Sequence, residues 1–130
     1  MNLDHQDYEL IERARRAIIP NYDGVNYMHT VGAALRTSSG GVYVGVNVYS
    51  LHGACAEQIA LGNAITAGER TFSVIVAVAG EQGETILAPC GNCRQILAYY
   101  MPKADVILPG ADGPFKAKAK DLLPWAYEVK

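Results

Sequence analysis

Residues 72–79, with the sequence FSVIVAVA, form a continuous apolar run rich in β-branched side chains. An extended segment without polar alternation is typical of a strand that is buried on both of its faces. Burial on both faces requires a sheet with packing layers on its two sides. We therefore expect this strand at the centre of a sheet that is covered by helices.

The flanking segments alternate between helical and extended patterns. Apolar residues recur at helical spacing before Pro20, and a Thr-Ser-Ser-Gly-Gly turn separates two β-rich stretches. The other expected elements are a helix at 4–19, a strand pair at 30–35 and 41–48, helices at 55–67 and 91–100, strands at 104–108 and 114–117, and a helical turn at 120–123. This order predicts an α/β fold with a mixed sheet.

Composition limits the class of protein. The 130 residues contain no repeat and no linker, so we expect residues 1–130 to form a single domain. A net charge of −2 gives no basic field for a nucleic-acid polymer. The sequence has no leader-like start and no long apolar segment, which favours a cytosolic protein that does not enter membranes.

The three cysteines lie at the start of two predicted helices. Cys55 opens one helix, and Cys90 and Cys93 open the other. An odd number of cysteines without a leader favours metal binding over disulfides. Three thiolates can fill three positions of a catalytic zinc site and leave the fourth to water, and a helix N-terminus stabilises thiolate. We therefore predict that these three residues bind zinc.

Two charged residues beside the cysteines suit a hydrolytic reaction. Glu57, two residues after Cys55, is close enough to exchange protons with a water at the metal without being a ligand. Three thiolates on a divalent metal leave a net charge of −1. Arg94, directly after Cys93, is our candidate to offset that charge by donating a hydrogen bond to a ligand sulfur.

Two other classes of protein remain open from the residues alone. Cys90 and Cys93 have the Cys-x-x-Cys spacing of a thiol redox pair, although the sequence around them is not of the thioredoxin type. The three cysteines could instead form a structural zinc site in a non-catalytic binding module. That module needs a fourth protein ligand, and the chain has no fourth cysteine.

The segments Cys55-Ala56-Glu57 and 89–95 (Pro-Cys-Gly-Asn-Cys-Arg-Gln) together resemble the cytidine deaminase superfamily. Residues 31–35, 45–49 and 121–127 look like the corresponding stretches of the blasticidin S deaminases in particular. The resemblance implies a three-layer α/β/α fold with a five-stranded mixed sheet, one zinc ion per subunit, and a homotetramer whose neighbouring subunits help to close each site.

The reaction implied by the resemblance is hydrolytic deamination of a cytosine ring to uracil, with release of ammonia. The expected substrate is a small nucleoside-like molecule, either an antibiotic of the blasticidin S type or a related cytosine nucleoside. The alternative is an ordinary cytidine and deoxycytidine deaminase of pyrimidine salvage.

The resemblance also suggests residues that contact the substrate: Asn47, Tyr49, His29, Ala56 and Tyr127. Tyr49 stands where ordinary cytidine deaminases have the glutamate that binds the ribose, so recognition of the sugar should differ. Glu84 stands where the blasticidin S deaminases have an arginine. His29 and His52 are kept outside the metal shell, because three thiolates and a water complete it.

Overall fold

A computed structural model of the chain describes residues 2–128, which form three helices, two 3₁₀ turns and a mixed sheet of six strands. The helical segments are α1 (His5–Ile18), η1 (Ile19–Asn21), α2 (Ala56–Thr66), α3 (Gly91–Tyr100) and η2 (Ala119–Leu122). The strands are β1 (Val31–Thr37), β2 (Val42–Val46), β3 (Phe72–Ala79), β4 (Thr85–Leu87), β5 (Asp105–Leu108) and β6 (Phe115–Lys118). Within residues 2–128, no helix is long and apolar enough to cross a membrane.

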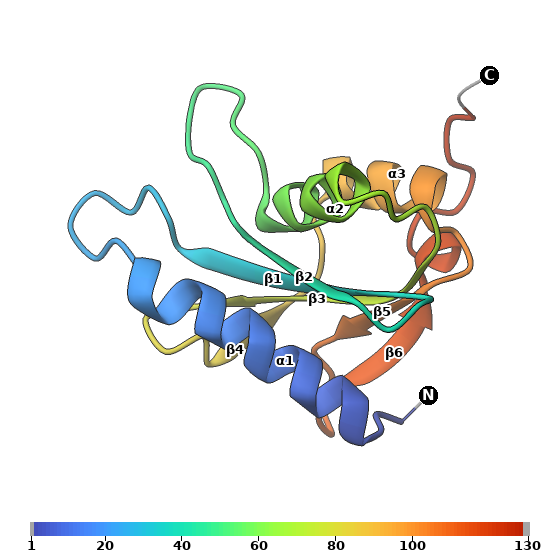
Figure 1. The fold of residues 1–130 in the computed structure, drawn as a ribbon, viewed down its shortest axis with the longest axis horizontal. Coiled ribbons are helices and arrows are strands. Elements are labelled where there is room, and N and C mark those ends of the chain that lie inside the picture. Colours follow the sequence, from blue (N-terminus) through green and yellow to red (C-terminus); the bar gives the residue numbers. More distant parts are fainter. Residues whose placement is uncertain (1, 129–130) are drawn as a thin grey trace.

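The elements form three layers, with α1 on one face of the sheet and α2 and α3 on the other (Figure 1). The strand order is β2-β1-β3-β5-β6, and β4 pairs with the end of β3. The predicted α/β/α fold is confirmed, and β4 is a strand in addition to the five expected. A three-residue strand is too short to leave a periodic pattern in the sequence.

Strand β3 is the centre of the sheet, as its sequence predicts. It pairs with β1 in antiparallel orientation and with β5 in parallel orientation, and residues 74–78 are buried. Ile75 and Ala77 pack in the core beneath α2 and α3, whereas Val76 and Val78 pack in the core beneath α1. The alternation of side chains along one strand thus supplies both cores.

Two glycines let the helices approach the sheet closely. A Cβ atom on Gly45 of β2 would lie 2.5 Å from the backbone nitrogen of Ala60 in α2. A Cβ atom on Gly32 of β1 would lie 2.5 Å from the carbonyl oxygen of Ala14 in α1. Because any larger residue would push against helix backbone, these two positions set the distance between each helix layer and the sheet.

Helix α1 is fixed at its start by acidic residues. Asp4 caps the helix by accepting a hydrogen bond from the Asp7 backbone, and the Asp7 carboxylate accepts one from the Asp4 backbone. Asp7 is only 4% exposed and lies 2.8 Å from Nζ of Lys116 in β6. The hydrogen bond to Asp7 raises the pKa of Lys116 above its ordinary value. This buried ion pair ties α1 to the edge of the sheet.

Candidate active site

The three cysteine sulfurs meet between the N-termini of α2 and α3. Cys55 is the N-cap of α2, Cys90 is the N-cap of α3, and Cys93 lies in the first turn of α3. The three Sγ atoms lie within 4.8 Å of one another, and those of Cys55 and Cys90 are 3.6 Å apart. The fold therefore brings together residues that are 35 positions apart in the sequence.

This sulfur cluster fits a zinc ion. Tetrahedral coordination with Zn–S distances of about 2.3 Å requires sulfur atoms roughly 3.8 Å apart, close to the separation observed. Among residues 2–128, no histidine or carboxylate joins the cluster, so a bound ion keeps a position for water. This is the arrangement of a catalytic centre and not of a closed structural site.

Thiol ionisation differs across the cluster. Burial raises the pKa of Cys93 far above its ordinary value, and burial also raises the pKa of Cys55. Burial acts in the same direction on Cys90, but hydrogen bonds, first of all from the Cys93 backbone N–H, outweigh it and lower the pKa of that thiol. A divalent cation would supply the charge that the thiols of Cys55 and Cys93 need in order to ionise.

Glu57 lies beside the sulfurs in the first turn of α2. Its side chain is 7% exposed, and burial raises the pKa of its carboxyl group above the ordinary value. Glu57, Cys55 and Cys90 line one pocket of about 300 Å³. A carboxyl group that holds its proton more tightly at the base of a pocket is suited to passing protons to and from a bound molecule.

The predicted substrate residues are divided between this pocket and its surroundings. Ala56 and Asn47 line the pocket, and Tyr49, which is 63% exposed, lies at its mouth. The side-chain oxygen of Asn47 accepts hydrogen bonds from the backbone of Thr30 (2.8 Å) and Val31 (3.0 Å). Its amide nitrogen donates to the carbonyl oxygen of Met28 at 3.3 Å. Asn47 thus retains one N–H for a ligand.

His29 and Tyr127 do not line the pocket. Nδ1 of His29 lies 2.8 Å from the backbone oxygen of Asn47, so the imidazole is held on the outside of the segment that Asn47 anchors. Tyr127 is 78% exposed and lines a different hollow, with Tyr99 on α3. Within one subunit, neither side chain reaches the sulfur cluster, and their roles in substrate binding stay predictions.

Glu84 also lies outside the pocket. It belongs to a hollow on the α1 side of the sheet, together with Tyr8 and Arg15. Its carboxylate accepts a hydrogen bond from the backbone of Gln82 at 3.0 Å. Within one subunit, the presence of Glu84 in place of an arginine therefore does not change the charge of the pocket beside the cysteines.

Arg94 makes different contacts from those predicted. Its guanidinium donates to the carbonyl oxygen of Pro89 at 2.8 Å and to that of Leu122 at 3.2 Å. Among the residues described, none of its hydrogen bonds ends on a sulfur. The side chain instead connects the turn before Cys90 to η2. The outer-shell donor that sequence reasoning missed is Gln58, whose Nε2 lies 3.7 Å from Sγ of Cys93.

The sequence left Ser50 and Asn92 without a predicted site role, and both line the pocket together with His52, whose place beside Gly53 and Cys55 suggested that position. Ser50 and His52 belong to the loop between β2 and α2, which an isolated bridge between Val48 and Ala54 closes. The one sequence signal that this loop lines the pocket is that it directly precedes Cys55. No lysine or arginine lines the pocket among residues 2–128.

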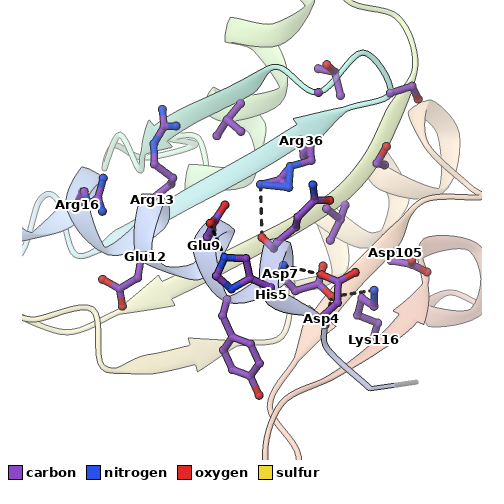
Figure 2. A pocket seen from close by; sticks show the side chains of 18 residues that line it. Asp4, His5, Asp7, Glu9, Glu12, Arg13, Arg16, Arg36, Asp105 and Lys116 are labelled. Carbon is purple, nitrogen blue, oxygen red and sulfur yellow. Dashed lines mark hydrogen bonds and ion pairs between the residues drawn. The ribbon is translucent and has the colours of Figure 1, made fainter.

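A larger hollow of about 940 Å³ lies on the α1 side of the sheet (Figure 2). Acidic and basic side chains of α1, β1, β5 and β6 face one another there, including the Asp7–Lys116 pair and the contact between His5 and Glu9 at 2.8 Å. The charges of this surface are of both signs, and it contains no thiol. The chemistry of the molecule therefore lies in the smaller pocket.

Known proteins share this architecture and much of this sequence. The family described as "Cytidine and deoxycytidylate deaminase zinc-binding region" matches residues 5–108. A blasticidin-S deaminase of Bacillus cereus is 33% identical over 135 aligned positions, which cover 97% of this chain and 95% of that protein. A probable cytidine deaminase of Dictyostelium discoideum is 37% identical over 105 positions, which cover 78% of this chain and 71% of that protein.

Solved structures agree with these relatives. The crystal structure of cytidine deaminase from Burkholderia pseudomallei superimposes with a TM-score of 0.77 at 34% identity, covering 96% of this chain and all of that one. The zinc-fitting sulfur cluster, the buried carboxyl group beside it and the family match over most of the chain all agree with one another. The chain accordingly belongs to the cytidine and deoxycytidylate deaminase family of zinc-dependent hydrolases.

Proposed function

We propose that the protein removes the amino group from the cytosine ring of a small nucleoside-like molecule of the blasticidin S type or a related cytosine nucleoside. Water is consumed, and the products are the corresponding uracil compound and ammonia. The observation that carries this proposal is the pocket in which Glu57 and two of the three clustered thiols face the same space.

Cys55, Cys90 and Cys93 are the residues that would hold zinc. When bound, zinc supplies Lewis acidity, which makes water a nucleophile near neutral pH. The carboxyl group of Glu57 takes a proton from the attacking water and passes it to the ring nitrogen, and it then delivers a second proton to the departing amine. Its burial in the pocket supports this role, because it brings the pKa of the carboxyl group closer to the pH at which both transfers occur.

The charge of the pocket favours a substrate without a phosphate. Three thiolates with one divalent cation carry a charge of −1, Glu57 adds a carboxyl group, and no lysine or arginine lines the pocket within residues 2–128. A phosphate dianion would enter this pocket without a cationic partner. We therefore favour a nucleoside-like substrate over deoxycytidylate.

One observation favours the blasticidin S type over pyrimidine salvage. Tyr49 lines the mouth of the pocket, and it occupies the sequence position at which salvage cytidine deaminases have a ribose-binding glutamate. Salvage of cytidine and deoxycytidine is the alternative, in which the remaining N–H of Asn47 contacts the sugar.

The experiment is a comparison of substrates on the zinc-loaded protein. Blasticidin S, cytidine, deoxycytidine and deoxycytidylate are incubated in parallel, and the ultraviolet change from cytosine to uracil is followed. We expect fast loss of blasticidin S and no turnover of deoxycytidylate. Turnover of cytidine and deoxycytidine alone would establish the salvage alternative, and turnover of none of the four would contradict the proposal.

We also propose that the protein forms a homotetramer, as its resemblance to the superfamily implies. The only charged residues of α2 and α3 are Glu57, which is buried, and Arg94, which binds backbone carbonyls. The exposed positions of these helices are uncharged, and Tyr99, Tyr100, Trp125 and Tyr127 are exposed on α3 and after it. An uncharged helical surface of this kind supports contact with further copies of the chain.

A further inference from the structure

Gln58 is, among the residues that the structure describes, the one side chain other than the cysteines that hydrogen-bonds a sulfur of the cluster. Its Nε2 lies 3.7 Å from Sγ of Cys93, and its own backbone nitrogen donates to the carbonyl oxygen of Cys55 at 3.0 Å. Gln58 therefore contacts two of the cysteines, the carbonyl group of Cys55 through its backbone and the sulfur of Cys93 through its side chain. Its side chain is half-buried between the two helices.

The direction of this hydrogen bond follows from the chemistry of the sulfur. A thiolate that binds a metal can only accept, so the amide must present its N–H group and not its oxygen. Cys93 is 1% exposed, so water has little access to share the charge of this sulfur. The amide of Gln58 is thus the partner left to Cys93, whereas Cys90 has the backbone N–H of Cys93 at 3.5 Å.

The groups that compensate the negative charge of the cluster therefore differ from the group expected from the sequence. The full positive charge of Arg94 is directed at the carbonyl oxygens of Pro89 and Leu122. The donors that reach sulfur within residues 2–128 are neutral, namely the amide of Gln58 and backbone N–H groups. Neutral donors withdraw less electron density from a thiolate than a guanidinium does.

We infer that Gln58 is a positioning residue that sets how strongly the Cys93 sulfur donates electrons to the metal. The inference deepens the proposed function and rests on it. A hydrogen bond from Nε2 holds the Cys93 thiolate in place and lowers its electron density. The metal then becomes a stronger acid than three unassisted thiolates would allow.

The test uses cobalt(II), which accepts the ligands of zinc and absorbs light through thiolate-to-metal charge transfer. Gln58→Leu keeps a similar volume and removes the donor, so we expect the charge-transfer band of the cobalt-loaded variant at longer wavelength. Gln58→Arg supplies a charged donor, and we expect the band at shorter wavelength. Zinc should leave Gln58→Leu about tenfold more readily in competition with a chelator.

Gln82→Leu is the matched control, because Gln82 is exposed on the turn between β3 and β4 and contacts no sulfur. Its band should coincide with that of the parent. If the parent shows a thiolate–cobalt band that neither Gln58 variant moves, the role of Gln58 is overturned and the zinc site stands. If Gln58→Leu does not fold, the shift of the charge-transfer band in Gln58→Arg is by itself the test of the role of Gln58. A parent that binds cobalt without a thiolate band overturns the zinc site and this inference together.

Discussion

At the scale of single residues, the carboxyl group of Glu57 performs all the proton transfers of the proposed reaction. Glu57 lines the pocket and is only 7% exposed. It is not one of the three residues whose ligand atoms cluster, so its chemistry can be separated from metal binding. This separation makes the role of Glu57 testable by an isosteric change.

We predict that Glu57→Gln lowers the deamination rate at least about 100-fold, the lower end of what a positioned acid–base group contributes. The amide has the shape of the carboxyl group but cannot carry the proton. Zinc content, measured on the purified protein, should stay at that of the parent. Glu9→Gln, an exposed change on α1, should keep full activity. Parental turnover by Glu57→Gln would falsify the proposed mechanism.

At the scale of elements, the site depends on how closely α2 lies on the sheet. Gly45 faces α2, which carries Cys55 and Glu57 at its start, and Gly32 faces α1, which carries no residue of the site. The two glycines lie on adjacent strands, where Gly45 pairs with Ala33 and Gly32 pairs with Val46. The two glycines therefore make equally close contacts with helices on opposite faces of the sheet, so that each serves as a control for the other.

We predict that Gly45→Ala and Gly32→Ala each lower the free energy of unfolding by about 1–3 kcal/mol, because the added methyl group pushes a helix outward. Only Gly45→Ala should also weaken zinc binding, since it displaces the helix that carries Cys55. Thermal unfolding and chelator competition, at a temperature where both variants are folded, measure the two effects. Equal zinc affinity in the two variants would show that the site does not depend on the position of α2.

At the scale of the whole molecule, the two helical faces differ in character. The α1 face carries charges of both signs around a broad hollow, as Figure 2 shows, whereas the outer surface of α2 and α3 is uncharged. Tyr99 and Tyr100 are half exposed, and their rings meet edge to face at 5.1 Å. This difference favours α2 and α3 as the face that meets further copies.

We predict that the double variant Tyr99→Glu, Tyr100→Glu dissociates the homotetramer, because four chains would each bring two new charges into the contact. Sedimentation velocity measures the mass in solution. Tyr8→Glu, on the exposed side of α1, is the control and should sediment like the parent. A double variant that keeps the parental mass would place the contact elsewhere on the molecule.

Most of the elements and the reactive groups can be predicted from short stretches of the sequence. The apolar run of β3 predicted the sheet centre, helical spacing before Pro20 predicted α1, and the local motifs around Cys55 and Cys90 predicted the zinc ligands. These signals are local, because periodicity, caps and short motifs act within one or two turns of the chain. Among the strands within residues 2–128, β4 alone left no such signal.

Which long side chains reach the site depends on contacts between segments that are distant in the sequence. Arg94 and Gln58 each stand next to a site residue in sequence, yet it is Gln58 that reaches a sulfur, whereas Arg94 turns to Pro89 and Leu122. Tyr127 and Glu84 lie in hollows away from the sulfurs. A long side chain has several rotamers of similar energy, and the partners that select one come from distant parts of the chain. The spacing of residues in the sequence therefore predicts the three cysteine ligands, whereas tertiary packing determines which side chains contact them.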